Sequence, residues 1–324
     1  MATAEKQRAA KPPSVVPVVS FDLGNRKVAI TDGTQIIAFP SYCMARFARQ
    51  DIDYSHADYL EHRSFGVDIG ARRFIVGKGA GDLGAQPTFG GDKWGLAEQF
   101  LFAALSTLGL PQGTHIQALR CSVPDDQSPT QRAPFERLAG REHTFQVNGR
   151  EHTLFIERVQ IVAEGKMAWY RAIKEGLLPY PHMPNGILDL GGGTAIARII
   201  SPNGTIDRAH EKVLQGGTSQ LAAMIAAEMG LNNIEGFILD AIANGSFSVH
   251  AHNFKPIYDA LLPQWVNGIK GEMRKSWNAI NDRYGHILVV GGSANIFRPF
   301  VEDNPRYIVA PNPQFYALEA MQNG

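Results

Sequence analysis

The 324-residue chain contains only two cysteines, Cys43 and Cys121, and they lie far apart in the sequence. Neither belongs to a Cys-x-x-Cys or Cys/His spacing, which argues against a disulfide framework and a structural zinc site. The ten histidines show no His-x-x-x-His or His-Glu-x-x-His spacing, so no catalytic zinc motif is indicated. We expect two buried apolar thiols in a reducing cytoplasm.

The chain also lacks an excess of positive or negative charge, because 31 Lys and Arg residues balance 31 Asp and Glu residues. Nucleic-acid affinity depends on a positive surface, so we expect no direct nucleic-acid binding. No apolar run approaches the ~20 residues that span a bilayer, so we expect no membrane segment. Residues 1–14 are rich in Ala, Lys and Pro without the apolar core of a signal peptide, which predicts a disordered tail and a cytoplasmic protein.

What the sequence does have is glycine at the ends of apolar runs, in a pattern that occurs twice. Val15 to Phe21 leads into Asp22-Leu23-Gly24-Asn25, and two further short strands follow. Gly186 to Leu190 leads into Asp189-Leu190-Gly191-Gly192-Gly193, and two short strands follow again. Such a repeat predicts two similar α/β domains that face one cleft.

The length fits two domains at roughly 100–200 residues each. We place the first domain at residues 15–170, joined by a C-terminal segment at 304–324, and the second at 171–303. The Pro-rich stretch Pro179 to Asn185 is interpreted as a crossing between them.

The two glycine turns are candidate phosphate sites. A strand that ends in a glycine turn exposes backbone N–H groups that can form an anion-binding nest. Asp22 beside a phosphate requires a cation, and Mg²⁺ held through waters is the usual one. Lys27 is expected to point back towards the phosphates. A plain β-turn remains the alternative for this first copy, since Asp-x-Gly is common in turns.

The second turn is the stronger signal, because a structural turn needs one glycine and rarely three. Gly191, Gly192, Gly193 and Thr194 could hold a polyphosphate opposite the first turn, with Asp22 and Asp189 around one Mg²⁺.

Two further segments carry candidate chemistry. Gly291-Gly292-Ser293 follows a buried strand, and bare backbone there can lie against adenine or ribose, although a tight strand-to-helix connection is the alternative. Glu164 stands at a strand-to-helix junction, where a carboxylate could orient or deprotonate the water that attacks a γ-phosphate. The alternative is a first-turn glutamate that favours the helix dipole.

The order of these motifs resembles the phosphate-1, connect-1, phosphate-2 and adenosine motifs of the actin, sugar-kinase and heat-shock chaperone ATPase superfamily. Within it, Arg73-Phe74-Ile75-Val76-Gly77-Lys78-Gly79-Ala80 and Val309-Ala310-Pro311-Asn312-Pro313-Gln314-Phe315 resemble plasmid-segregation actins of the ParM (StbA) type. The resemblance covers nearly all of residues 15–324.

The resemblance implies a two-domain actin-like (ribonuclease H-like) fold that binds ATP and Mg²⁺ between its domains, hydrolyses ATP and forms filaments for plasmid or DNA segregation. By analogy Glu164 orients or deprotonates the attacking water, and Asp189 binds the metal. Asn25 and Lys27 stand where the family has polar contacts with the phosphates. It also suggests that Gly216 and Gly217 line the nucleotide cleft, although a simple N-cap turn is the alternative for them. Glu272 and Lys275 are suggested to touch ribose and adenine, and a solvated ion pair is the alternative for these two residues.

The implied partners are further copies of the chain in a filament and a possible DNA-binding adaptor protein. A sugar- or acid-kinase-like phosphotransferase on the same fold is the main competing function, and a non-polymerising actin-like regulator is another. Asp68-Ile69-Gly70 copies the Asp-x-Gly pattern, but its position between two short strands predicts a hairpin turn.

Overall fold

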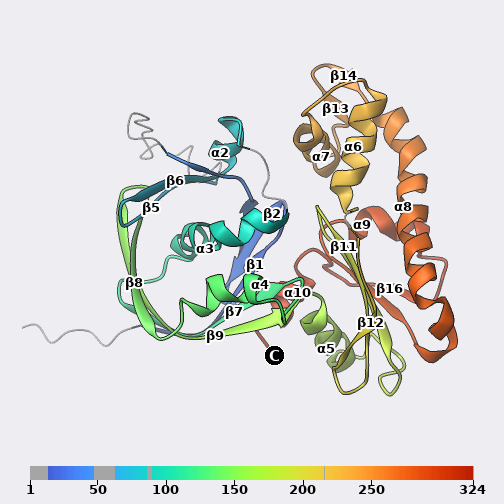
Figure 1. Ribbon diagram of the computed structural model, residues 1–324, viewed down its shortest axis with the longest axis horizontal. Coiled ribbons are helices and arrows are strands. Elements are labelled where there is room, and N and C mark those ends of the chain that lie inside the picture. Colours follow the sequence, from blue (N-terminus) through green and yellow to red (C-terminus); the bar gives the residue numbers. More distant parts are fainter. Residues whose placement is uncertain (1–13, 47–62, 86–89, 215, 324) are drawn as a thin grey trace, which may run out of the picture.

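The computed structural model describes residues 14–46, 63–85, 90–214 and 216–323. Two α/β halves lie side by side, and each is built on its own sheet (Figure 1). We call the nine-stranded sheet the large sheet and the five-stranded sheet the small sheet. The predicted tail falls outside the described residues, apart from Ser14. Within the described ranges, no helix has the length and apolar character needed to cross a membrane.

The large sheet combines a parallel centre with antiparallel flanks. Its strands in spatial order are β3 (Ile36–Pro40), β2 (Lys27–Thr31), β1 (Val15–Leu23), β7 (Thr114–Val123), β9 (Arg150–Ala163), β8 (Arg141–Val147), β5 (Ser64–Ile69), β6 (Arg72–Gly77) and β4 (Cys43–Ala45). β1, β7 and β9 run parallel to one another, while every other pairing in the sheet is antiparallel. The sheet curves around helix α3 (Ala97–Ser106) (Figure 1).

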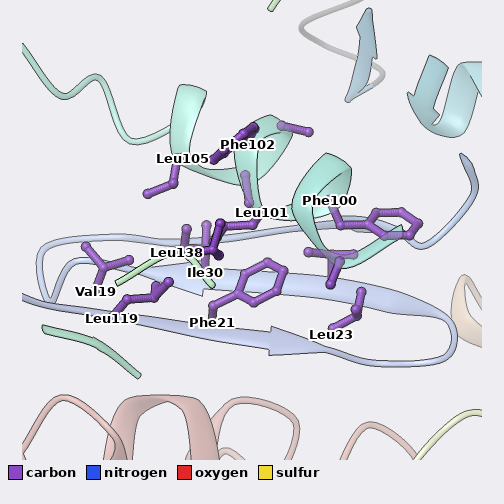
Figure 2. Packing of buried hydrophobic residues seen from close by; sticks show 14 of the residues in the cluster. Val19, Phe21, Leu23, Ile30, Phe100, Leu101, Phe102, Leu105, Leu119 and Leu138 are labelled. Carbon is purple, nitrogen blue, oxygen red and sulfur yellow. The ribbon is translucent and has the colours of Figure 1, made fainter. Parts of the chain in front are cut away.

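Helix α3 forms the centre of the first core because it is apolar on almost every side. Eight of its ten residues are buried, as expected for a helix enclosed by other elements. Figure 2 shows Phe100 and Leu101 above Phe21 and Ile30 of the β1–β2 hairpin. This packing fixes the hairpin, and therefore the turn at its end, against the rest of the large sheet.

The small sheet carries helices on both faces. Its strands in spatial order are β12 (Ile206–Leu214), β11 (Ala195–Ile200), β10 (Asn185–Leu190), β15 (Ile287–Val290) and β16 (Tyr307–Val309). Side chains alternate between faces, so Leu188 joins the core formed with α6 (Thr218–Glu228), α7 (Glu235–Ala243), α8 (Lys255–Trp277) and α9 (Ala294–Phe297). Its neighbour Ile187 joins the core formed with α5 (Lys166–Lys174) and α10 (Tyr316–Ala320).

Shorter elements complete the described chain. They are α2 (Lys78–Asp82), α4 (Pro129–Glu136), the strand pair β13 (Ser248–Val249) and β14 (His252–Asn253), and the 3₁₀ turns η1 (Gly90–Leu96), η2 (Asn278–Arg283) and η3 (Arg298–Phe300). Of these, η1 matters most for function because it lies beside the end of β1, where the Lys93 ammonium donates to the Leu23 carbonyl.

The predicted repeat is present, and the α/β fold class is confirmed. β1, β2 and β3 form one antiparallel meander, and β10, β11 and β12 form the other. Asp22 pairs with Ala29 and Asp189 with Ile196, so each aspartate occupies the penultimate position of the leading strand. The Asp68-Ile69-Gly70 copy is a hairpin turn, because Ile69 pairs directly with Arg72.

The arrangement differs from the expected domain boundaries at two places. A boundary at residue 170 cuts through α5, yet Ala168, Trp169 and Ala172 of this helix pack in one core with residues of the small sheet. Residues 304–324 were expected in the first domain. Tyr307 pairs with Ile287 and extends the small sheet, whereas Leu318 and Met321 pack with Ala29 of the large sheet. Long-range strand pairing and helix packing decide both placements, and neither leaves a local sequence signal.

Candidate functional site

A cavity of about 640 Å³ lies between the two halves and is lined from both. Twelve of the residues singled out in the sequence line it: Asp22, Gly24, Asn25, Lys27, Glu164, Asp189, Gly191, Gly192, Thr194, Gly291, Gly292 and Ser293. They come from the β1–β2 turn, the start of α5, the β10–β11 turn and the segment after β15. The fold therefore gathers segments that are more than 250 residues apart in the chain.

The two glycine turns pack against each other at the cavity. A Cβ atom added at Gly192 would lie 2.5 Å from Arg26 Cγ, and one added at Gly193 would lie 2.5 Å from Asn25 Nδ2. Both distances are far below normal contact, so only glycine allows this approach. Gly193 serves this packing and is not among the cavity-lining residues. The glycines bring the β1–β2 turn and the β10–β11 turn to the same edge of the cavity.

Gly217 packs directly against the second turn, whereas the neighbouring Gly216 carbonyl accepts a hydrogen bond from Trp265. A Cβ atom at Gly217 would lie 2.5 Å from the Gly191 carbonyl oxygen, and the Gly217 amide donates to Gly193. Neither glycine lines the cavity, whereas Thr218, at the start of α6, does. The expectation that this segment belongs to the cleft therefore holds for Thr218 and for the backing of the turn, but not for direct lining by the two glycines.

Glu272 and Lys275 lie outside the cavity. Their side chains pair with each other on α8 and are 43% and 73% exposed, which matches the solvated i,i+3 pair considered as the alternative. Helix α8 instead contributes Tyr258 and Leu262 to the lining, about three to five turns earlier. The structure therefore places neither Glu272 nor Lys275 at the cavity.

Three carboxylates face the cavity from different elements. Asp22 is the penultimate residue of β1, and its Oδ1 accepts a hydrogen bond of 2.7 Å from Ser122 Oγ on β7. Asp189 is the penultimate residue of β10, and Gly291 leaves room for it, because a Cβ at Gly291 would lie 2.6 Å from Asp189 Oδ1. Glu164 precedes α5, which starts only at Lys166, so it is not a first-turn residue that serves the helix dipole.

Burial and mutual repulsion perturb these carboxylates. Desolvation, together with the negative charges of Asp22 and Asp189, raises the pKa of Glu164 to about 8 against the opposing effect of Lys93. Desolvation, followed by the charge of Asp22, raises the pKa of Asp189 to about 7. A cation placed between these groups would relieve the repulsion, and strongly perturbed carboxylates in a cleft are typical of functional sites.

The donor set fits a hydrated Mg²⁺ better than a fully coordinated metal ion. Among the described residues no group of three His, Cys, Asp or Glu side chains is placed to hold a metal ion. Mg²⁺ keeps several waters and is usually bound by one or two carboxylates together with phosphate oxygens. Asp22 and Asp189 meet that requirement, since both carboxylates line the cavity next to the glycine turns.

Arg198 of β11 fixes the backbone around Glu164. Its guanidinium is fully buried, pairs with Glu211 at 2.6 Å, and donates to the carbonyl oxygens of Glu164 and Pro124. The Glu164 amide in turn donates to the Val123 carbonyl at 2.9 Å. Both backbone groups of Glu164 are therefore hydrogen-bonded, so the point at which its side chain leaves the cavity wall is fixed.

Replacement of Arg198 by methionine is expected to destabilise the fold by about 3 kcal/mol, because it strips buried partners from two carbonyls and one carboxylate. The urea midpoint measured by circular dichroism reports this loss. Arg283→Met, at an exposed position of η2, is the control and should change stability by less than about 0.5 kcal/mol. Equal midpoints for the two variants would show that the Arg198 contacts are dispensable.

Several lining residues were missed by sequence reasoning. Lys93, Ser122 and Arg26 line the cavity, and Arg26 also crosses between the halves to pair with Asp240 of α7 at 3.0 Å. An apolar wall from the second half was missed as well, and it consists of Leu239, Ile242, Ala243, Tyr258, Leu262, Ile296 and Pro299. Arg26 lies within the first glycine turn, between Asn25 and Lys27, and Lys93 lies between Gly91 and Gly95. The other positions have no motif around them.

Comparison with known proteins places this arrangement among actin-like structures. No known family model matches the sequence, and a sequence comparison with curated proteins finds no match. The archaeal actin homolog Ta0583 is similar at a TM-score of 0.77 and 19% identity, over 95% of this chain and 98% of that one. The apo psk41 ParM protein is similar at 0.67 and 17% identity, over 95% and 96%.

A ParM filament from Clostridium botulinum, described as 15-stranded, is similar at a TM-score of 0.71 and 13% identity, over 94% of this chain and 98% of that one. These likenesses extend along nearly the whole of each chain, and they agree with the two meanders and the cavity between the halves. The chain has the actin-like fold shared by archaeal actin homologs and ParM proteins.

Proposed function

We propose that this protein binds ATP with Mg²⁺ in the cavity between its halves, hydrolyses the ATP and polymerises into filaments that segregate plasmids or other DNA. The observation that carries the proposal is the convergence of two glycine turns and three carboxylates on one cavity of about 640 Å³. That volume lies within the usual range of ~300–1,000 Å³ for small-molecule sites.

The glycine turns are the proposed phosphate cradle. Backbone N–H groups of the β1–β2 and β10–β11 turns can donate to phosphate oxygens, with Asn25, Lys27 and Thr194 adding side-chain contacts from the lining. Asp22 and Asp189 would hold Mg²⁺ through water, and the metal would supply the positive charge that the polyphosphate and the carboxylates lack.

Glu164 is the proposed base or orienting group for the attacking water. A raised pKa makes its carboxylate a stronger proton acceptor once it is ionised, which suits general base catalysis near neutral pH. Its backbone is held by Arg198 and Val123, so the water that it binds would keep a fixed position.

The base and ribose have a separate part of the cavity. Gly291, Gly292 and Ser293 line it with little side-chain bulk, and Leu239, Ile242 and other apolar residues of the second half form the opposite wall. A flat, mostly apolar ring fits such a wall, and one structural neighbour, the archaeal actin homolog Ta0583, is a complex with ADP.

Polymerisation is proposed from the fold and from the ParM filament among its neighbours. A two-half molecule that closes on ATP presents two different, complementary faces, and repeated head-to-tail contact between such faces gives an open filament. Because the formal net charge is zero, there is little like-charge repulsion between copies to oppose self-association. We place the protein in the cytoplasm and expect an adaptor protein to link the filament to DNA, because the chain's own charge does not favour direct DNA binding.

Sedimentation of the purified protein with a slowly hydrolysed ATP analogue tests the proposal. Pelletable protein should appear only above a critical concentration, at or below about tens of micromolar, and ADP should reduce it. A parallel sample without nucleotide is the control.

An absence of pelleting across this range, together with ATP turnover that a sugar or small acid stimulates, would replace the filament by the kinase function. A protein that binds ATP but neither assembles nor transfers phosphate would match the non-polymerising regulator. Failure to bind ATP or ADP at all would refute the proposed function as a whole.

A further inference from the structure

Lys93 is the most unusual charged residue of the cavity. Its side chain is only 4% exposed, although lysine is almost never fully buried without a partner. The ammonium donates to the Leu23 carbonyl oxygen at 3.0 Å and lies 4.5 Å from the centre of the Trp94 ring. Leu23 stands between Asp22 and Gly24, so the ammonium is anchored at the first glycine turn itself.

The charge of Lys93 has no direct ion-pair partner within the described part of the chain, where the salt bridges up to 4.0 Å do not include it. Its ammonium carries three donors, and the structure records one hydrogen bond for it, to Leu23. Burial lowers the pKa of Lys93, while the more distant charges of Glu164 and Asp22 raise it. A buried ammonium with free donors is costly unless a further acceptor arrives.

The position of Lys93 in the cavity indicates which group of a bound nucleotide its free donors would contact. It lines the cavity together with Asp22, the proposed metal-side carboxylate, and Glu164, the proposed base. Its ammonium is fixed at the Leu23 carbonyl, directly after Asp22 in β1. In phosphoryl transfer the terminal phosphate lies between the metal and the attacking water, and negative charge spreads over its oxygens in the transition state. Fixed positive groups aimed at such charge provide a large part of catalysis.

We propose that Lys93 binds the terminal phosphate of a nucleoside triphosphate and stabilises the charge that develops there during hydrolysis. The inference rests on the proposed ATPase function and adds to it a residue that distinguishes ATP from ADP. Lys27, the cation singled out in the sequence, differs in being exposed, so it is more hydrated and less able to act in this way.

Lys93→Met, which keeps the length of the side chain and removes its charge, is the test. Hydrolysis should slow by about 10²-fold or more. The preference for a slowly hydrolysed ATP analogue over ADP should fall by about tenfold or more, as for the loss of a charge-assisted hydrogen bond, while ADP affinity stays within a few-fold. Nucleotide affinity is measured by calorimetry. Lys174→Met, on the exposed end of α5, is the matched control and should change neither quantity.

Lys93→Gln keeps a donor for the Leu23 carbonyl and serves where the methionine variant does not fold. The same losses are expected for it. Equal weakening of ATP-analogue and ADP binding, or unchanged hydrolysis in a folded variant, would overturn the proposal and leave Lys93 a structural counter-charge. This outcome is distinct from failure of the proposed function, in which the unmodified protein neither binds nor hydrolyses ATP.

Discussion

Glu164→Gln is expected to slow ATP hydrolysis by about 10²-fold or more, while ADP affinity stays within a few-fold. Glutamine has the same shape but cannot accept a proton, so the change isolates the chemistry. The backbone contacts of Glu164 with Arg198 and Val123 do not involve the side chain and should survive. If hydrolysis limits filament lifetime, filaments of this variant should also persist after ATP is exhausted.

Single-turnover measurement of phosphate release gives the hydrolysis rate directly, and calorimetry gives the affinity. Glu302→Gln, at an exposed position just after η3, is the control and should match the unmodified protein. A Glu164→Gln variant that no longer binds nucleotide would assign the residue to the architecture of the cavity. One that hydrolyses at the normal rate would remove it from the mechanism.

The repeated strand and glycine pattern was readable because its signal is local. The short apolar runs and the glycines after Asp22 and Asp189 all report on their own immediate geometry. The two meanders and the position of each aspartate at a strand end followed from them. The convergence of both turns on one cavity was an inference from the repeat, and the cavity lining agrees with it.

Other features could not be read because they depend on packing between distant segments. Lys93 meets Leu23 across 70 positions, and Arg26 meets Asp240 across 214. The sequence around each shows only an ordinary charged residue. Similarly, β16 is a three-residue strand whose sheet is decided by its pairing with β15, so its assignment to one half or the other had no local basis.

The position of Glu272 and Lys275 outside the cavity has a geometric cause. Which turn of α8 reaches the cavity depends on how the helix crosses the small sheet. In the structure Tyr258 and Leu262, in the N-terminal part of α8, line the cavity, while the pair lies near the other end of the helix. An offset of three or more turns along a helix displaces a side chain by at least about 15 Å, which is enough to remove it from a site.

Asp189→Asn is expected to slow Mg²⁺-dependent ATP hydrolysis by about 10²-fold or more. Asparagine keeps the size of the side chain, which matters because Gly291 leaves little space beside Asp189 Oδ1. The amide removes the negative charge that a hard cation requires. It also removes repulsion with Asp22, so the apo protein should not lose stability. A large loss of hydrolysis without a loss of stability would therefore identify a ligand of the metal rather than a structural residue.

Titration of hydrolysis with Mg²⁺ at saturating ATP separates these roles, and thermal unfolding of the apo protein reports stability. The variant should require at least about tenfold more Mg²⁺ for half-maximal rate, since one of two carboxylate contacts to the hydrated ion is weakened. Asp282→Asn, at an exposed position in η2, should leave both curves unchanged. A normal Mg²⁺ requirement in Asp189→Asn would exclude this carboxylate from the metal site. Asp22, which is hydrogen-bonded to Ser122 within the large sheet, would then have to hold the ion without Asp189.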